Sequence, residues 1–418
     1  MHDVTRQSHL LDVVELLWRE PLKSQLQKCG RSVPDGVLEE YVLIPNARNP
    51  RIVVPAHSRT AAAAVRGHGG GASVLRRMGV TTLAASLRVG LGHWVFSDRL
   101  RVYGSQSSRP SSSITGHLSS LFQQPVQLAF QVTRARANRK PVLRVLDAEA
   151  RTLAFVKVGT NALTRQLVRN EADALRRLSE GRFLKTTIPD VLTSHSWREV
   201  ELLVLKPLPI GYRSHRADAA SIMAAAKEIG EVDGVIERSL LASSYWRHLG
   251  ARLEACDDER AVELMGAVAL LASITSELRL PFGAWHGDWA PWNMATNGGR
   301  LLVWDFERFQ SGVPLGMDAF HFALQTKILL PGWDTEHEIA RGLAQAAGTV
   351  APLGVPSDVA DIVFVVYLLE IAARWLEDRQ GDTPQSSTVL DGMVHGAVSA
   401  IHQVAGWRLG ARGKSVGS

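Results

Sequence analysis

Apolar residues recur along the chain with two different periods, and the change of period separates regions of different structure. Within residues 1–30 the apolar side chains recur at helical spacing, which predicts one amphipathic helix. They are Leu10, Val13, Val14, Leu17 and Trp18. Two short apolar runs follow at 41–44 and 52–54, and the Pro and Asn residues between them predict a hairpin. Residues 57–79 are rich in Ala, Gly and Arg and predict a loop.

The pattern changes after a serine-rich segment at 105–116, which is the best candidate for a linker. The runs PVQLAFQV, PVLRVLD and RTLAFVKVG predict three strands. The run LTRQLVRNEADALRRLSEG then predicts a helix ended by Gly181. The run IPDVLTSHSWREVELLVLKPLP predicts two further strands that stop at the prolines. Helical patterns predominate from about residue 217, interrupted by short strands near residues 285–305.

These elements predict an α+β protein with a two-lobed layout. We expect a five-stranded antiparallel N-lobe at 116–208 and a mainly helical C-lobe at 209–418, which would carry the catalytic and metal loops. An N-terminal α/β extension at 1–115 would precede both lobes. At 418 residues the chain is long enough for two or three units with their own cores.

Composition favours a soluble cytoplasmic protein. The sequence is 45% hydrophobic and 21% charged, which is ordinary for a globular chain. Its two cysteines, Cys29 and Cys256, cannot form a disulfide framework. The first twenty residues mix acidic with apolar residues and do not read as a signal peptide. The most apolar late run, 359–376, contains Asp361 and Glu370, which predicts a buried helix rather than a membrane span.

The net charge of +6 conceals an asymmetry along the chain. Residues 51–157 hold sixteen Arg or Lys against three Asp or Glu, whereas the remainder of the chain is acidic on balance. This distribution favours an anion as the partner of the basic part. A solvated arginine-rich surface explains the same excess. The basic segment lacks regularly interleaved aromatic residues and any known module, so we do not expect nucleic-acid binding.

One of only nine lysines lies in an unusual place. Lys157 sits inside the apolar run LAFVKVG, where an ammonium group must either reach solvent or meet an anion. Fourteen residues later Glu171 lies in the helix that follows. A strand lysine held by a carboxylate from the next helix can be aimed at a phosphate. Apolar strands with a single lysine are also common, and this pair alone is a weak signal.

A second group of polar residues follows the spacing H-x-D-x-x-x-x-N. His286, Asp288 and Asn293 have this spacing, and Asp305 ends an apolar run twelve residues later. The order is that of phosphoryl-transfer sites. Asp288 would orient or accept the proton of an attacking hydroxyl. The amide oxygen of Asn293 and the carboxylate of Asp305 would ligate Mg²⁺, which prefers hard oxygen donors. No cysteine or histidine cluster accompanies His286, which argues against zinc.

The region from about 121 to 330 resembles the aminoglycoside phosphotransferase and choline kinase-like branch of the protein-kinase fold. WHGDWAPWN is similar to that family's H-G-D-x-x-x-x-N loop, and VWDFE to its metal-binding strand end. GVPLGMDAF is similar to the segment that follows, with Asp318 as a structural acid, and FVKVG with Glu171 to the lysine–glutamate pair. The resemblance implies ATP as phosphate donor, with GTP as an alternative, and Mg²⁺. It also implies nucleotide contacts at the proline-marked hinge, from Leu205, Lys206 and Leu208.

Two features depart from the family pattern. The turn at 133–141, TRARANRKP, has no glycine, although phosphate-covering loops normally use glycine so that backbone N–H groups can approach the ligand. Its cationic side chains either replace that function or form a solvated basic hairpin. Trp285, Trp289 and Trp292 surround the lone acid. They either pack the loop against the helical lobe, or Trp289 or Trp292 stacks on the acceptor.

The sequence therefore predicts an ATP-dependent phosphotransferase that acts on a hydroxyl group of a small molecule. An aminoglycoside-like antibiotic, a sugar, a nucleoside or choline would fit, and no particular oligomeric state is predicted. One alternative is a non-catalytic nucleotide-binding scaffold, which would be expected to lose one of the four site residues. The other alternative is a protein kinase, which would carry a longer segment between Asp305 and Asp318 than the twelve residues present here.

Overall fold

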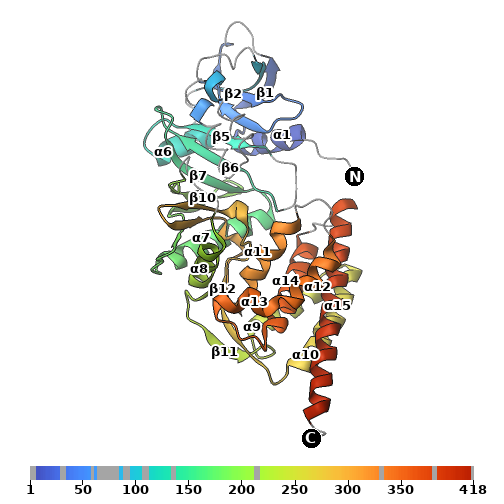
Figure 1. Cartoon of the computed structure of the whole chain (residues 1–418). Coiled ribbons are helices and arrows are strands. Elements are labelled where there is room, and N and C mark those ends of the chain that lie inside the picture. The colour runs from blue at the N-terminus through green and yellow to red at the C-terminus, as the bar shows by residue number, and fades with distance from the viewer. Residues whose placement is uncertain are drawn as a thin grey trace. The chain divides into compact units, whose positions relative to one another are not determined.

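In the computed structural model the chain forms two compact units (Figure 1). Unit 1 comprises Met1–Ala172 and Pro189–Ser214, and unit 2 comprises Asp173–Ile188 and His215–Ser418. The structure describes residues 6–28, 34–57, 61–63, 84–87, 95–105, 113–132, 138–210, 217–328, 334–378 and 384–415. Much of the loop predicted at 57–79, of the linker at 105–116 and of the basic turn at 133–141 lies outside these residues.

Unit 1 is built on one nine-stranded sheet with the order β1-β4-β2-β3-β5-β6-β7-β10-β9, and every neighbouring pair is antiparallel (Figure 1). Its strands are β1 (Lys23–Lys28), β2 (Val37–Ile44), β3 (Ile52–Pro55), β4 (Asp98–Tyr103), β5 (Gln127–Gln131), β6 (Val142–Leu146), β7 (Thr152–Gly159), β9 (Val191–Trp197) and β10 (Val200–Leu205). Strand β10 is buried at every position and β7 along most of its length, so both strands lie in the interior of unit 1.

The first 115 residues belong to this sheet. Strands β1 to β4 all come from this segment, and β3 joins the rest through β5, with Val53 opposite Phe130. The hydrophobic core of the sheet is also shared, because Leu10 and Leu17 of helix α1 (Arg6–Leu17) belong to the same cluster as Val156 of β7. The predicted boundary at 115 therefore lies within one sheet, and the boundaries of the compact units fall elsewhere in the chain. The predicted five-stranded sheet has four more strands because pairing continues across the serine-rich segment.

A buried carboxylate ties this segment to the helix that precedes β5. Glu39 on β2 is 8% exposed and accepts hydrogen bonds from Trp18 Nε1 at 3.1 Å and from the Tyr41 hydroxyl at 2.6 Å. It also accepts from Ser113 at 3.0 Å and from Thr115 at 2.7 Å. Ser113 is at the same time the N-cap of helix α6 (Ile114–Leu121). A buried charge is tolerated where hydrogen bonds replace its hydration, as they do here.

Unit 2 is mainly helical and contains two small sheets. Its helices are α8 (Ala219–Gly230), α9 (Ser244–Glu254), α10 (Glu259–Thr275), α11 (Met317–Ile328), α12 (Thr335–Ala344), α13 (Ala346–Val350), α14 (Ala360–Glu377) and α15 (Pro384–Ser415). The sheets have the orders β11-β12-β15 and β13-β14-β8. Their strands are β8 (Thr186–Thr187), β11 (Ile236–Ser239), β12 (Arg279–Trp285), β13 (Met294–Asn297), β14 (Arg300–Val303) and β15 (Gln310–Pro314).

Helix α14 is the buried helix predicted at 359–376, and that prediction is confirmed. Its side chains from Ala360 to Arg374 are almost all buried, and α15 packs along α10, α12 and α14. The buried carboxylate of Glu370, which interrupts the apolar run, is hydrogen-bonded within unit 2. It accepts from Arg252 at 3.0 and 2.9 Å. None of the helices in the described part of the chain combines the length and apolar character that a membrane crossing requires.

The four bonds to Glu39 predict a large effect of its removal. In Glu39→Leu, three hydroxyl groups and one indole N–H would be left buried without their acceptor, and we expect a loss of about 2–4 kcal/mol in the free energy of unfolding. Glu39→Gln keeps one acceptor oxygen and should lose less. Urea denaturation of both variants measures this difference, with Glu149→Gln at an exposed carboxyl as control. Equal stability of Glu39→Leu and the native protein would show that the cluster does not hold this segment.

Candidate active site

The loop that follows β12 is shaped by one close backbone contact. Gly287 has a φ of +82°, and a Cβ at this position would lie 2.3 Å from the carbonyl oxygen of Arg308. Only glycine fits, because a side chain would meet backbone that cannot move aside. The contact brings the loop carrying Asp288 against the 3-10 helix η3 (Phe306–Arg308), which follows Asp305. The glycine of the H-G-D motif therefore has a structural reason in this chain.

His286 links the same two segments from the inside. Its Nε2–H donates to the carbonyl oxygen of Trp304 at 3.1 Å, and its Nδ1 accepts from the backbone N–H of Asp288 at 3.1 Å. A carbonyl can only accept and an N–H can only donate, so the ring is neutral with its proton on Nε2. Burial lowers the pKa of His286 to about 4, against the attraction of Asp288. Both ring nitrogens of His286 are thus bound to the backbone, and the ring joins the loop to the residue before Asp305.

Two ionisable side chains from helices of unit 2 also hold the loop backbone. Asp318, at the start of α11, accepts from the N–H of His286 at 2.6 Å and from that of Gly287 at 3.1 Å. Burial raises the pKa of Asp318 to about 7, although these N–H groups and the charge of Arg374 favour its ionised form. Arg374 of α14 donates to the Gly287 carbonyl and stacks on the Trp285 ring, 4.8 Å from its centroid. The loop has little freedom to move.

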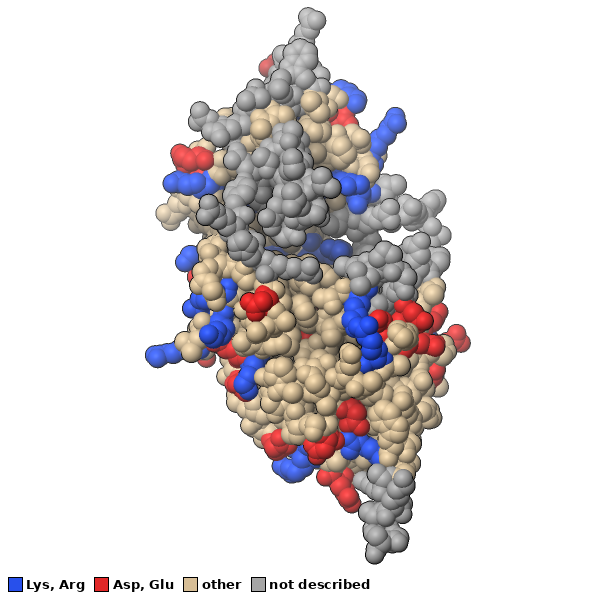
Figure 2. All heavy atoms as spheres, in the orientation of Figure 1, with Lys and Arg blue, Asp and Glu red and all other residues tan. Residues whose placement is uncertain are grey.

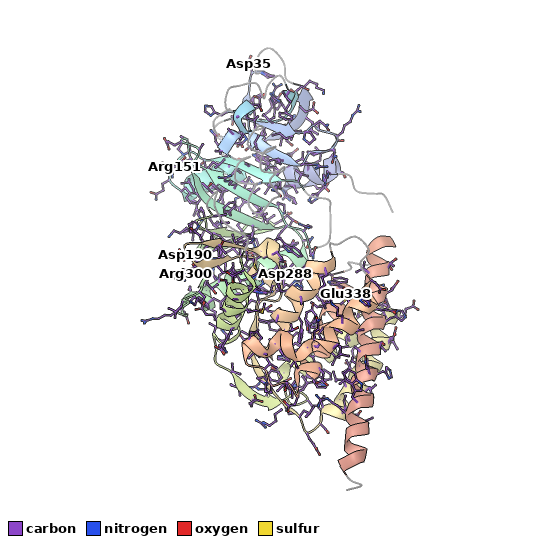
Figure 3. All side chains as sticks on the ribbon, in the orientation of Figure 1. Asp35, Arg151, Asp190, Asp288, Arg300 and Glu338 are labelled. Atoms are coloured by element: carbon purple, nitrogen blue, oxygen red, sulfur yellow. The ribbon has the colours of Figure 1, made fainter. Side chains whose placement is uncertain are left out.

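Asp288, labelled in Figure 3, is held by both of its carboxylate oxygens. Oδ2 accepts from Asn293 Nδ2 at 2.7 Å, and Oδ1 accepts from His321 Nε2 at 3.1 Å. The side chain is 33% exposed, so it reaches solvent between these partners. Burial raises the pKa of Asp288, but the hydrogen bond and charge attraction from His321 outweigh it, and the pKa lies below its usual value. Asp288 is thus an oriented, ionised carboxylate that is open on one side.

Asn293 is buried and can turn only one way. Its Nδ2 donates to the Asp288 carboxylate and to the Asp288 carbonyl oxygen, the latter at 3.0 Å. Both partners are acceptors, so the amide nitrogen must face them and Oδ1 must face away. Asn293 closes the short helix η2 (Pro291–Asn293), and its carbonyl accepts from Trp304 N, next to Asp305. The amide oxygen is therefore available to a further ligand at a fixed position.

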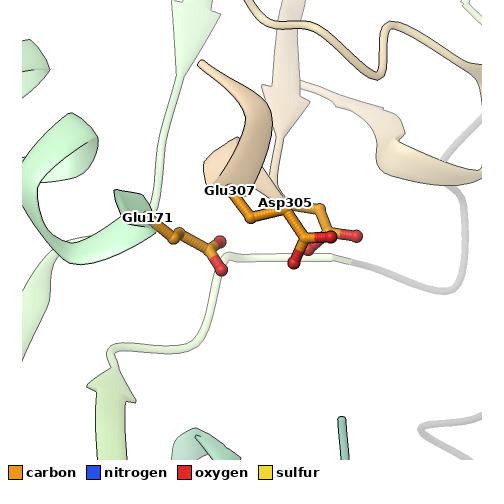
Figure 4. A group of neighbouring side chains, drawn as sticks. All are labelled: Glu171, Asp305 and Glu307. Carbon is orange, nitrogen blue, oxygen red and sulfur yellow. The ribbon is translucent and has the colours of Figure 1, made fainter. Parts of the chain in front are cut away.

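Asp305 ends the strand β14 region in a strained backbone conformation. Its φ is +73° and ψ is 51°, a left-handed conformation that few residues other than glycine adopt, although Asn and Asp adopt it more readily than most. The negative charge of Asp305 acts to raise the pKa of Asp288, as expected of neighbouring carboxylates. This effect is smaller than the lowering by His321. Glu307 follows on η3, and carboxylate oxygens of the two residues lie within 4.8 Å (Figure 4). The pair concentrates hard oxygen donors at this point.

Unit 1 carries the predicted lysine–glutamate pair. Lys157 Nζ on β7 donates to Glu171 of α7 (Ala162–Ser179), at 2.7 Å to Oε1 and 2.5 Å to Oε2. Glu171 is fully buried, and the Lys157 side chain is 9% exposed. The carboxylate thus fixes the direction of an ammonium group inside an apolar sheet. The contact between the two residues is as expected, and their role toward a nucleotide stays a prediction.

The hinge residues lie at the end of β10 and directly after it in unit 1. Leu205 is buried, whereas Lys206 is exposed and contacts Asp190 at 3.3 Å. Leu208 is partly buried, and its carbonyl accepts from Ile210 N at 2.7 Å. Their contacts to a nucleotide remain predictions. In the turn at 133–141 only residues 138–141 are described, so its proposed phosphate contact lies largely outside the described residues.

The three tryptophans of the loop have different roles. Trp285 and Trp289 are buried, and Trp289 packs edge-on against His286, with 5.6 Å between the ring centroids. These two support the interpretation as core residues. Trp292 on η2 is 45% exposed and is the tryptophan that remains available to an acceptor. Most of the bulk beside the lone acid thus lies in the core of unit 2.

Sequence reasoning did not find three residues that touch this site. His321 contacts Asp288, Glu307 lies beside Asp305, and Arg374 holds Gly287. Glu307 could have been suspected from the spacing D-x-E. His321 lies three residues after Asp318, so one turn of helix brings it to the same side of α11. Arg374 comes from a helix more than eighty residues away, and no local signal indicates it.

Comparisons with known proteins give structural likeness only. No protein-family description matches the sequence, and no curated protein matches it. A solved structure of a thermostable mutant of aminoglycoside phosphotransferase APH(4)-Ia, in a ternary complex with ADP and hygromycin B, is 12% identical, with a TM-score of 0.45 over 69% of this chain and 98% of that one. Amicoumacin kinase in complex with AMP-PNP, Ca²⁺ and its ligand is 12% identical, with a TM-score of 0.40 over 64% and 89%.

A third solved structure, ADP-bound aminoglycoside phosphotransferase APH(2'')-Ib, is 15% identical, with a TM-score of 0.41 over 68% of this chain and 97% of that one. The chain is thus similar to small-molecule phosphotransferases. At these identities and scores the likeness carries no conclusion about what this chain acts on. Its chemistry has to come from its own residues.

The state of His286 can be tested by nitrogen-detected NMR. We expect a neutral ring with Nε2–H down to about pH 5, identified by loss of its signals in His286→Gln. Because the folded pKa of about 4 lies below the unfolded value of about 6.5, the unfolded chain binds the extra proton first. Stability should therefore fall as the pH drops from about 6.5 to 4. A midpoint above pH 6 would contradict the buried, doubly bonded ring.

Proposed function

We propose that this chain is an ATP-dependent phosphotransferase that phosphorylates a hydroxyl group of a small molecule. The observation that carries the proposal is the clamped carboxylate of Asp288, held between Asn293 and His321 and open to solvent on one side. An ionised carboxylate in a fixed orientation suits one task in particular, the positioning of a hydroxyl for attack. The neighbouring Asp305 would supply the second carboxylate of a phosphoryl-transfer site, the one that binds the metal ion.

The low pKa of Asp288 determines how it would act. A weakly basic carboxylate cannot remove the proton from an alcohol in the ground state, so Asp288 would first orient the hydroxyl through a hydrogen bond. The hydroxyl oxygen attacks the γ-phosphorus, the bond to the bridging oxygen breaks, and that electron pair leaves with ADP. As the new O–P bond forms, the hydroxyl becomes acidic and its proton passes to the Asp288 carboxylate. The products are ADP and a phosphate monoester.

The donor set of unit 2 fits Mg²⁺. The amide oxygen of Asn293 is turned away from Asp288, and Asp305 and Glu307 bring carboxylate oxygens close together. Amide and carboxylate oxygens are the ligands that Mg²⁺ prefers. We propose that Asn293 and Asp305 hold the ion, with Glu307 as a further ligand. Bound Mg²⁺ would offset the negative charge of the nucleotide phosphates.

For the nucleotide itself, Lys157 is the residue that we assign to the phosphates. Its bond to Glu171 keeps the ammonium from turning to another anion, which is the arrangement that a phosphate-binding strand lysine requires. Leu205, Lys206 and Leu208 are assigned to the base of the nucleotide on the strength of the sequence resemblance. ATP is the proposed donor and GTP the alternative.

Two other functions are less consistent with these residues. A non-catalytic nucleotide-binding scaffold needs no oriented base, yet Asp288 has a dedicated partner for each of its oxygens. A protein kinase needs a long segment between the metal acid and the next helix, and α11 begins twelve residues after Asp305. Acidic and basic side chains are interspersed over the described face of unit 2 in Figure 2, so this face favours no particular charge of acceptor.

The roles of the two acids can be separated by binding measurements. Asp288→Asn keeps the shape of the side chain and removes the base, so a non-hydrolysable ATP analogue with Mg²⁺ should bind as in the native protein while turnover falls by roughly 10²–10⁴. Asp305→Asn should weaken the metal-dependent part of nucleotide binding as well as turnover. Asn293→Ala should fall between them. Calorimetry with and without Mg²⁺ measures this, with the exposed Asp257→Asn as control.

The assignment of the two acids would be wrong if Asp288→Asn abolished analogue binding and Asp305→Asn left it unchanged. Native affinity and turnover in both variants would exclude catalysis at this loop altogether.

The lysine of unit 1 can be tested apart from its contribution to stability. Lys157→Met should lower turnover by about 10²–10³ and, because Glu171 would remain buried without this ammonium group, destabilise unit 1 by about 3–5 kcal/mol. In Lys157→Met/Glu171→Gln the orphaned charge is gone, so the melting temperature should recover while turnover stays low. Lys23→Met, at an exposed lysine of β1, is the control. If turnover recovers together with stability, the pair is purely structural.

A further inference from the structure

A chain of three hydrogen-bonded side chains runs from the core of unit 2 to the proposed base. The hydroxyl of Tyr367 on α14 lies 3.3 Å from His321 Nδ1, and His321 Nε2 lies 3.1 Å from Asp288 Oδ1. Tyr367 is 1% exposed and His321 is 3% exposed, whereas the Asp288 side chain is 33% exposed. These hydrogen bonds thus connect two buried side chains to the Asp288 carboxylate, which is partly exposed to solvent.

The partners of His321 determine where its proton lies. The Asp288 carboxylate is ionised and can only accept, so His321 must donate from Nε2. In the neutral ring Nδ1 is then an acceptor, and the Tyr367 hydroxyl supplies the matching donor. Both ring nitrogens thus have a hydrogen-bond partner, and Nε2 is the nitrogen that donates to Asp288. Tyr367 is packed in turn against Phe320 and Phe364, which leaves its hydroxyl little freedom.

We propose that His321 is a positioning residue for the reaction: it fixes the direction of the Asp288 carboxylate from the side opposite to Asn293. This inference rests on the function proposed above. With a donor on each oxygen, the carboxylate plane cannot rotate, and the remaining lone pairs point to the exposed side, where a hydroxyl would lie. Nothing in the H-x-D-x-x-x-x-N spacing provides for this residue, which comes from α11 instead.

Loss of the His321 N–H donor would affect the orientation of both Asp288 and Asn293. A carboxylate held only at Oδ2 can turn about its last torsion, and Asn293 would lose the fixed acceptor that keeps its own amide in place. Small displacements of a catalytic group lower the reaction rate strongly, since a displacement of about 1 Å can lower a rate about 100-fold. A histidine that merely fills the core would have no such effect, provided that its volume is replaced.

Two substitutions distinguish these roles. His321→Leu keeps an apolar side chain of similar bulk and removes the donor, whereas His321→Gln carries an N–H at nearly the position of Nε2. We expect ADP formation from Mg·ATP to fall by about 10- to 100-fold in His321→Leu and to stay within about threefold of native in His321→Gln. The affinity for a non-hydrolysable ATP analogue should be unchanged in both. His395→Gln, at an exposed histidine bound to a backbone carbonyl, is the matched control.

A second measurement on the native protein does not depend on the folding of a variant. Nitrogen-detected NMR should find a proton on His321 Nε2, and Asp288→Asn should shift those ring signals. A ring without a proton on Nε2, or His321→Leu with native turnover, would overturn the proposal. If the native protein forms no ADP although His321 has the expected tautomer, the proposed function fails instead. The two failures are therefore distinguishable.

Discussion

The carboxylate of Asp318 is the constraint on which the loop of unit 2 depends. It binds two successive backbone N–H groups, those of His286 and Gly287, and thereby sets the path of the chain just before Asp288. Burial makes this carboxylate costly, as its pKa of about 7 indicates. Because the folded pKa lies above the unfolded one, the cost grows as the pH rises from about 4 toward 7. Burial of Asp318 thus lowers the stability of the folded protein, while its two hydrogen bonds fix the loop backbone.

Three further contacts fix the backbone of this loop. His286 joins the loop to the strand before Asp305, Arg374 fixes the Gly287 carbonyl, and the Gly287 backbone rests on Arg308. Within this loop the Asp288 carboxylate keeps an exposed side, and the amide oxygen of the buried Asn293 is turned away from Asp288. Rigidity of the backbone thus becomes orientation of two side chains, which is what phosphoryl transfer demands, since its catalysis is mainly positioning and electrostatics.

The sequence predicted the parts of the protein that local patterns determine. The α+β class, the strands around Lys157, the buried helix α14 and the residues of the Asp288 loop follow from periodicity and spacing. The pairing of β3 with β5 could not be predicted, because a long-range strand pair leaves no trace in the pattern of either strand. His321 and Arg374 were missed for the same reason: helices distant in the chain bring them to the loop.

The central claim is that this chain moves a phosphoryl group to a hydroxyl. Phosphorus NMR of the full chain with Mg·ATP and pools of hydroxylated small molecules tests it most directly. The account predicts that the γ-phosphate signal of ATP decreases while signals of ADP and a new phosphate monoester grow in equal amounts in at least one pool. Unchanged ATP signals in area and line width in every pool, with correctly folded protein, would contradict it.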